Sequence, residues 1–421
     1  MGSIPPDSQA LGGRAPRRRG HPTPQRPDHQ ASSRHLLTAG DFPRRRPSPL
    51  SRRGEDDAAR GPKPMGLHHA AQGDADMPRR LAITGPHRVE VLEYTDPPLG
   101  PRQVLVRTEI ASGKHGTTLA LFDNVNFRGQ RFDQSMRLFV PEEGEPPSGQ
   151  RPMNTGTSGV GVVAQVGEEV TRWKVGDRVF GLMDIRETNV CAEDALWPLG
   201  SLDPHLALCV EPAYVAFHCI RESPVRWGDS VAVIGLGAIG LLAVRMAATA
   251  GAELVVAVDP IARRRQWAAD NGADCAIDPA TQDAALEIHR LAGGRGVDVA
   301  IEAAGTYAAL QTAIRAARIT GTVCSAGFYQ GEAQGLWLGR EWHHNRLNVV
   351  VPHGCGWGHP PRDYPRWDEH RAYDAIIALM RKGVLTAPGL IDPVVPLDQG
   401  PEVFRWIEHE PTKVLKFAVR F

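Results

Sequence analysis

The sequence predicts an α/β protein in which a doubly wound parallel sheet is joined to a smaller β-barrel-like domain. Residues 230–260 hold an apolar strand, a glycine-rich turn, a long helix-forming run and a second apolar strand. Strand and helix candidates then alternate as far as residue 351, which is the order typical of a doubly wound sheet. Residues 80–182 instead carry short runs that alternate apolar and polar side chains, the pattern of half-buried strands.

The composition places the chain among globular enzymes and binding proteins. Hydrophobic residues make up 42% of the 421 residues, and 48 basic residues balance 48 acidic ones. This balance gives no reason to expect nucleic acid or a membrane surface as a partner. The six cysteines form no C-x-x-C pair, no apolar run reaches the ~18 residues that span a bilayer, and no signal-peptide pattern opens the chain. We therefore expect a cytoplasmic protein with reduced thiols.

Residues 1–76 differ in composition from the rest of the chain. They are crowded with proline, arginine, glycine and serine and contain almost no aromatic residues. Such a segment cannot bury enough apolar surface to offset its ordering entropy, so it is predicted to be disordered. Its arginine clusters could contact anionic partners; the alternatives are a solvated tail, or a chain that truly starts at Met77.

The remaining chain divides into three predicted parts. Residues 77–212 form the first part of a catalytic domain, residues 213–351 form a cofactor-binding domain, and residues 352–421 return to the catalytic domain. The returning part contains a predicted helix from Asp368 to Lys382 and the strand-like ending KVLKFAVRF.

The strongest motif is the run Gly235-Leu236-Gly237-Ala238-Ile239-Gly240. It follows the apolar strand 231–234, opens a helix, and is followed by a second strand that ends in Asp259, nineteen residues after Gly240. This is the context of a dinucleotide-binding turn, in which glycines allow a tight turn and let the backbone approach a pyrophosphate at a helix N-terminus. Ala304 and Gly327, after the next predicted strands, complete the expected cofactor contacts.

Asp259 predicts which dinucleotide is bound. A carboxylate here accepts hydrogen bonds from the ribose hydroxyls and repels a 2′-phosphate, so NAD is favoured over NADP. The arginines at 263–265 weaken this preference, because Arg264 and its neighbours could pair with a phosphate or could form a solvated helix face.

Several segments together resemble the medium-chain dehydrogenase/reductase superfamily, which includes alcohol and sorbitol dehydrogenases. The resemblance covers most of residues 80–421. It is specific because the matching segments occur in the same order as in the family. They are PPLGPRQVLVRTEIASGKHGTTL, GTSGVGVVAQVGEEVTRWKVGDRVFG, EPAYVAFHCI, GDSVAVIGLGAIGLLAVRMAATAGAELVVAVDP, DVAIEAAG and KVLKFAVRF. The resemblance implies a GroES-like β-barrel catalytic domain, a Rossmann NAD-binding domain, and a homodimer or homotetramer.

The chain departs from this family at the catalytic zinc. Zinc members carry Cys-Gly-Thr-Asp where this chain has His115-Gly116-Thr117-Thr118, and Gly-His-Glu where it has Gly156-Thr157-Ser158. Only Glu211 keeps a metal-binding residue type at its position. His115 and Glu211 make two ligands where a catalytic zinc needs three, so zinc is not expected. The four-cysteine structural zinc lobe is also missing. The stretch GREWHHNRLNVV resembles zinc-lacking, bacteriochlorophyllide dehydrogenase-like relatives.

Without zinc, side chains must accept the hydroxyl proton and stabilise the developing alkoxide. We expect His115 or Lys114 to be the acid/base, Thr117 to relay a proton, and Glu211 to orient the cation. The alternatives are that His115 is a buried structural histidine and that Lys114 is a surface lysine.

A second polar cluster consists of His343, His344 and Arg346. It is predicted either to contact the substrate or the nicotinamide, or to form a hydrogen-bond network at a domain or subunit interface. Two long segments, residues 122–150 and 353–370, are predicted to be loops that cap the active site.

The function expected from these features is NAD-dependent interconversion of a secondary alcohol and a ketone. The substrate is expected to be a sugar-like, cyclitol or specialised-metabolite molecule. The alternatives are a zinc-free enone or quinone reductase, an epimerase or lyase that uses bound NAD transiently, and a non-catalytic NAD(H) sensor.

Overall fold

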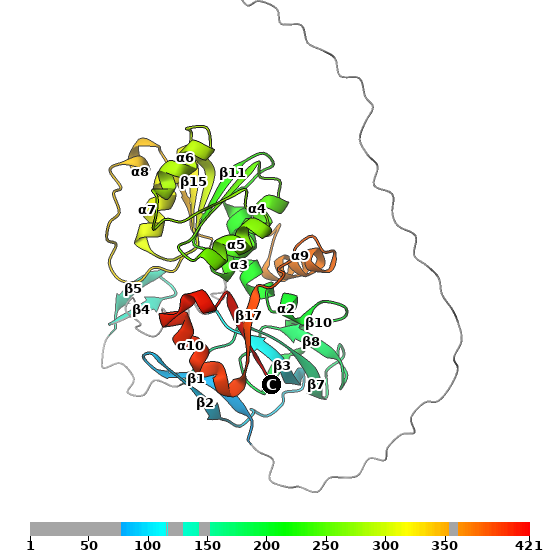
Figure 1. Ribbon diagram of the computed structural model, residues 1–421. Helices are drawn as coiled ribbons and strands as arrows, with labels where there is room; N and C mark the ends of the chain where they lie inside the picture. Colours follow the sequence, from blue (N-terminus) through cyan, green and yellow to red (C-terminus); the bar gives the residue numbers. More distant parts are fainter. Residues whose placement is uncertain (1–76, 115, 117–128, 143–151, 353–360) are drawn as a thin grey trace, which may run out of the picture. The chain divides into compact units, whose positions relative to one another are not determined.

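The computed structural model describes residues 77–114, 116, 129–142, 152–352 and 361–421 (Figure 1). Within these residues the chain forms a strand-rich part and a parallel α/β part. The first contains a three-stranded antiparallel sheet, a seven-stranded sheet that is antiparallel except for its β17–β18 pair, and one small hairpin, and the second contains a single six-stranded sheet.

The strand-rich part is organised around the long strand β3 (Gln103–Ser112). It lies in a seven-stranded sheet of order β10-β8-β7-β3-β18-β17, in which β9 also pairs with β3. The other strands of this sheet are β7 (Ser158–Val166), β8 (Arg178–Gly181), β9 (Thr188–Ala192), β10 (Leu196–Pro198), β17 (Ile391–Pro396) and β18 (Lys416–Arg420). The C-terminal strand β18 runs antiparallel to β3, with Val419 opposite Ala111. The end of the chain therefore completes a sheet that begins at residue 103.

A second, three-stranded sheet has the order β2-β1-β6. Its strands are β1 (Arg79–Gly85), β2 (Arg88–Glu93) and β6 (Met153–Asn154). The predicted loop over residues 122–150 was partly wrong, because it contains the hairpin β4 (Gln130–Asp133) and β5 (Leu138–Pro141). Phe132 and Phe139 meet across this hairpin with ring centroids 5.1 Å apart, a cross-strand aromatic pair that short alternation alone did not reveal.

The parallel sheet confirms the predicted doubly wound architecture. Its strand order is β13-β12-β11-β14-β15-β16, and every neighbouring pair is parallel. The strands are β11 (Ser230–Ile234), β12 (Leu254–Val258), β13 (Cys275–Ile277), β14 (Val297–Glu302), β15 (Ala317–Ser325) and β16 (Asn348–Val350). The order reverses between β11 and β14, and such a switch point opens a crevice at the carboxyl ends of the strands.

Alternate residues of the central strands enter two different hydrophobic clusters. Val231 and Val233 pack with helices α3, α4, α5 and α9, whereas Ala232 and Ile234 pack with α6 and α7. Both faces are thus buried, which explains the unbroken apolar run of the strand. Figure 1 shows α4 and α5 on one side of β11 and β15, with α6 and α7 on the other. The helices are α2 (Pro204–Ala207), α3 (Val210–Glu222), α4 (Ala238–Thr249), α5 (Ala262–Asp270), α6 (Ala284–Leu291), α7 (Tyr307–Ala316), α8 (Glu341–His344), α9 (Glu369–Arg381) and α10 (Gly400–His409).

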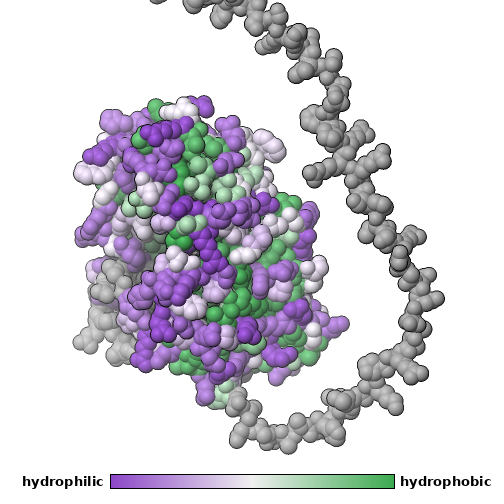
Figure 2. All heavy atoms as spheres, in the orientation of Figure 1, coloured by the Kyte–Doolittle hydropathy of each residue, from purple (hydrophilic) through white to green (hydrophobic). Residues whose placement is uncertain are grey.

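Helix α9 falls within one residue of its predicted bounds at each end. Asp368 caps it, because its carboxylate accepts the backbone N–H of Arg371 at 2.8 Å. On the face shown in Figure 2, polar residues alternate with small apolar areas. In the described part of the chain, no helix is both long enough and apolar enough to cross a membrane.

Candidate active site

The glycine-rich turn lies at the carboxyl end of β11 and leads into α4. Gly235 has φ +92°, and a Cβ there would lie 2.5 Å from the backbone N of Ala304. A Cβ on Gly240 would lie 1.9 Å from the carbonyl O of Gly235, so only glycine lets the helix pack this closely on the turn. Gly237 caps α4 and has no atom within 4 Å of an ideal Cβ. The open space faces the first turn of the helix, where Ala238 and Ile239 are half-buried. This space fits a pyrophosphate at a helix N-terminus.

Asp259 joins this turn to the end of β12. One carboxylate oxygen accepts the N–H of Leu236 and the other accepts the N–H of Ile261, each at 2.8 Å. A carboxylate has about four acceptor positions, so two remain for ribose hydroxyls. Nη1 of Arg264 is 3.7 Å from the same carboxylate.

The two neighbouring arginines are engaged elsewhere. Arg263 pairs with Asp392, and Arg265 pairs with Asp278 at 3.0 Å while donating to the carbonyl of Asp259. Arg264 is therefore the member of the triplet that lies against the Asp259 carboxylate.

The ends of β14 and β15 meet around a carboxylate that sequence reasoning missed. Glu302 is fully buried, and its Oε1 accepts the N–H groups of Ala304 and Gly305 at 2.8 Å each. Its Oε2 accepts the phenol O–H of Tyr329 at 2.5 Å. A Cβ on Gly327 would lie 2.4 Å from Oε2. The expected cofactor positions 304 and 327 therefore both contact Glu302, and the carboxylate that ends the strand VDVAIE was the available signal.

The second group of expected site residues lies between β3 and α3. Lys114 follows β3, and its Nζ lies 2.6 Å from Oε1 of Glu211 in the first turn of α3. The Glu211 side chain is 9% exposed and that of Lys114 is 23% exposed. Lys114 is thus no ordinary surface lysine, because its ammonium contacts a buried carboxylate. His115 and Thr117 fall outside the described residues, so their expected roles stay predictions.

A further lysine that the sequence did not single out lies beside this pair. Lys416 on β18 is buried, and its Nζ donates to the carbonyl of Gly113 at 3.0 Å. Burial lowers its pKa, which the neighbouring Glu211 carboxylate opposes. The Cys209 thiol faces the same region, and burial raises its pKa to about 12. Two lysines and one carboxylate therefore lie close together at the ends of β3, α3 and β18, and a charged residue inside the largely apolar ending KVLKFAVRF was the missed signal.

The donors among the described residues are too few for a catalytic zinc, and His115 lies outside those residues. Within the described ranges, no three His, Cys, Asp or Glu side chains come together in a way that could hold a metal ion. Oε1 of Glu211 is already bound by the Lys114 ammonium, and the Ser158 hydroxyl donates to the carbonyl of Leu208 at 3.0 Å. No catalytic step is therefore derived through zinc.

The cluster His343, His344 and Arg346 does not meet either group. These residues lie in and just after α8, immediately before β16. Because β16 is parallel to the other strands, this is the opposite edge of the sheet from Gly235 and Glu302. The two histidine rings contact each other edge to face, 5.5 Å between centroids.

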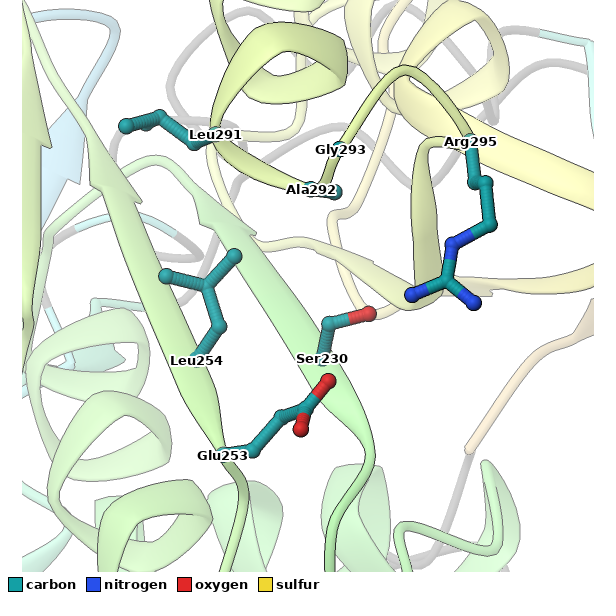
Figure 3. A pocket seen from close by; sticks show the side chains of 7 residues that line it. All are labelled: Ser230, Glu253, Leu254, Leu291, Ala292, Gly293 and Arg295. Atoms are coloured by element: carbon teal, nitrogen blue, oxygen red, sulfur yellow. The ribbon is translucent and has the colours of Figure 1, made fainter. Parts of the chain in front are cut away.

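A cavity of about 320 Å³ opens at this same opposite edge. Figure 3 shows the side chains of Ser230, Glu253 and Arg295 pointing toward one another, with Leu254 and Leu291 beside them. Ser230 begins β11 and Leu254 begins β12, so the cavity lies away from the cofactor turn. It carries neither the glycine turn nor the lysine–glutamate pair.

Comparison with known proteins agrees with the fold and the turn. The family model for the alcohol dehydrogenase GroES-like domain matches residues 100–201, and that for zinc-binding dehydrogenase matches residues 238–367. A D-guloside 3-dehydrogenase of Escherichia coli (strain K12) is 35% identical over 82% of this chain and 100% of its own length. An (R,R)-butanediol dehydrogenase of Bacillus subtilis (strain 168) is 29% identical over 62% of this chain and 79% of its own.

Solved structures show the same fold at lower identity. The 2R,3R-butanediol dehydrogenase from Bacillus subtilis matches with a TM-score of 0.63 and 24% identity, over 82% of this chain and 99% of that one. The alcohol dehydrogenase from Thermus sp. ATN1 matches with a TM-score of 0.62 and 22% identity, over 81% and 99%.

A parallel sheet with a dinucleotide turn, joined to a GroES-like domain, defines a nicotinamide-dependent oxidoreductase. The chain belongs to the medium-chain dehydrogenase/reductase superfamily.

Proposed function

We propose that this protein is an NAD-dependent dehydrogenase that interconverts a secondary alcohol and a ketone on a sugar-like or cyclitol substrate, without catalytic zinc. The observation that supports the proposal is the buried Lys114–Glu211 ion pair at 2.6 Å, because the family resemblance puts Glu211 at a metal-ligand position. The proposal keeps a homodimer or homotetramer, as expected of the family, and a cytoplasmic location.

The cofactor assignment rests on Asp259. Its carboxylate is fixed by two backbone N–H groups and keeps acceptor capacity for ribose hydroxyls, whereas a 2′-phosphate would approach a negative charge. Gly237 leaves room for the pyrophosphate. When NAD is bound, its nicotinamide ring takes up the hydride from the substrate carbon.

Lys114 performs the proton transfer in this proposal. In alcohol oxidation the Lys114 ammonium first releases a proton to solvent; its neutral amine then accepts the hydroxyl proton as the hydride leaves the same carbon for NAD⁺, and the regenerated ammonium pairs again with Glu211. In the reverse direction the ammonium returns the proton to the developing alkoxide. His115 is the alternative acid/base and Thr117 the relay, both outside the described residues.

The substrate class rests on the whole-length relative. The D-guloside 3-dehydrogenase aligns over its whole length with 82% of this chain, so a ring secondary alcohol is the class to test first. Substrates of this size present several hydroxyls, which suits a site built from charged side chains.

The test is a cofactor and substrate screen on the full-length protein, with zinc content measured on the same sample. We expect NADH formation with hexoses, glycosides or cyclitols, weak activity with NADP, and less than one zinc per ten chains. NADPH-dependent reduction of enones or quinones without alcohol oxidation would contradict the proposal. Tight NADH binding with no turnover on any of these would instead indicate a sensor, and stoichiometric zinc would restore a metal mechanism.

The assignment of the acid/base is tested separately with His115→Ala. If Lys114 carries the proton, this variant keeps a pH profile of the same shape between pH 6 and 9. A lost or shifted limb in that range would transfer the role to His115.

A further inference from the structure

The Glu302 carboxylate is the centre of a directed hydrogen-bond chain. The Ser325 hydroxyl donates to the phenol oxygen of Tyr329 at 3.0 Å, and that phenol donates to Oε2 of Glu302. The tyrosine ring is held by stacking on Tyr307, with centroids 5.3 Å apart. With the two backbone N–H groups on Oε1, three donors converge on one buried side chain.

These donors indicate the charge state of Glu302. An ionised carboxylate only accepts hydrogen bonds, and all three partners donate to it. Burial raises the pKa of Glu302, while the Tyr329 hydroxyl and the N–H groups of Gly305 and Ala304 oppose that rise. The carboxylate end of β14 therefore carries a fixed negative charge that is enclosed by protein.

The position of this charge relative to a bound cofactor follows from the sheet order. A dinucleotide lies across the switch point between β11 and β14, and Asp259 on β12 marks the adenosine side. The nicotinamide side is then above β14 and β15. Glu302 ends β14, and the backbone of Gly327 and of Ala304 lies against its carboxylate.

We infer that Glu302 makes this site prefer the oxidised cofactor, because its buried carboxylate attracts the positively charged nicotinamide ring of NAD⁺ and not the neutral ring of NADH. This inference rests on the proposed function, since it needs NAD(H) in the crevice. A fixed charge acts over a longer range in a low-dielectric interior than in water. Glu302 is thus a positioning and electrostatic residue, held in place by Tyr329, and takes no proton from the substrate.

The experiment measures the dissociation constants of NAD⁺ and NADH separately for full-length wild type and Glu302→Gln by calorimetry. The amide keeps an acceptor for the backbone N–H groups, so the loss is mainly one of charge. We expect NAD⁺ to bind about five- to tenfold more weakly and NADH to change less than twofold. An equal change for both cofactors, or none, would overturn the inference.

The matched control is Asp298→Asn on the same strand. Asp298 lies at the other end of β14, where it accepts from Ser230 at 2.7 Å and pairs with Arg318 at 2.6 Å. The Asp298→Asn substitution removes the same charge at the opposite edge of the sheet. The ratio of the two dissociation constants should match wild type in this control; a ratio shifted as far as in Glu302→Gln would show that net charge alone is responsible.

A second variant covers the case in which Glu302→Gln does not fold. Tyr329→Phe removes one donor to the carboxylate, so the pKa of Glu302 rises further and its charge is lost at a higher pH. The groups facing Glu302 are Tyr329 and Ser325, with the Cys324 thiol beside Tyr329. As the pH is lowered from 8, the preference for NAD⁺ should begin to fall at a higher pH in this variant than in wild type. Parallel behaviour of the two proteins would overturn the inference.

Failure of the inference and failure of the proposed function give different results. If wild type binds neither NAD⁺ nor NADH, the proposed function fails and the charge has nothing to act on. If wild type binds both and the variants leave their ratio unchanged, only the role of Glu302 is wrong.

Discussion

The cofactor turn is built from backbone atoms, whereas the lysine–glutamate pair is built from side chains. At Gly235, Gly237 and Gly240 the shape comes from the backbone, and the absence of a side chain is what matters. At Lys114 and Glu211 the shape comes from two side chains that meet at 2.6 Å. A site made of backbone admits few substitutions, whereas a site made of side chains can exchange one chemistry for another on the same strands. This is why one region keeps the family pattern and the other departs from it.

The largest effect is expected from Gly240→Ala, compared with Gly237→Ala. The added methyl at 240 would meet the carbonyl of Gly235 at 1.9 Å, so the protein should lose about 3 kcal/mol of unfolding free energy as well as its cofactor. The methyl at 237 meets no protein atom, so only NADH affinity should fall, at least tenfold. Denaturant unfolding measures the free energy of unfolding, and titration with NADH measures the cofactor affinity. Equal stability of both variants would contradict the close packing at Gly240.

The next effect concerns the side-chain region. Lys114→Met should lower kcat/KM about 100- to 1000-fold, because it removes the proposed acid/base, and should lower the melting temperature, because Glu211 is left as an unpaired buried charge. The double variant Lys114→Met, Glu211→Gln should recover the melting temperature and not the turnover. Lys174→Met, at an exposed position, is the control. Recovery of turnover in the double variant would show that the pair is only structural.

A smaller effect is expected at the junction of Asp259 with the turn. Asp259→Asn keeps the side-chain shape and removes the charge that opposes a 2′-phosphate, with Arg264 3.7 Å away to receive it. The ratio of NAD to NADP affinity should fall about tenfold. Asp278→Asn, which loses a carboxylate paired with Arg265, should leave the ratio unchanged.

The smallest effect is expected from metal removal. Prolonged treatment with a strong zinc chelator should change turnover less than twofold, because the described residues provide no three-ligand set. Loss of activity that returns on adding zinc would show that residues outside the described ranges complete a metal site.

The sequence was sufficient to predict elements whose backbone conformation or burial restricts which residue types can stand at each position. The apolar strands, the glycine turn and helix α9 were predictable, because burial on both faces and left-handed or crowded backbone leave direct traces in residue type. The sequence left open whether Lys114 is a site residue or a surface lysine. Its contact with Glu211 depends on the tertiary packing of β3 against α3, which local patterns do not show. Glu302 and Lys416 were missed because each stands at the end of a largely apolar strand, and the side chain or carbonyl that each contacts, Tyr329 or Gly113, is 27 or 303 positions away in the sequence.

The location of His343 and His344 shows the same limit. Their sequence position near the end of the sheet did not say which edge they occupy, and only the parallel direction of β16 places them away from the glycine turn.

The pairing of β18 with β3 also has a consequence for biosynthesis. Lys416 reaches the carbonyl of Gly113 across 303 positions of the chain. At ~5–20 residues per second, a ribosome needs roughly 15–60 seconds to make the intervening chain. During that interval one edge of β3 lacks its partner, and an unpaired strand edge favours intermolecular association. The nascent chain is therefore expected to depend on chaperones until β18 emerges, and slower growth at lower temperature should raise its soluble yield.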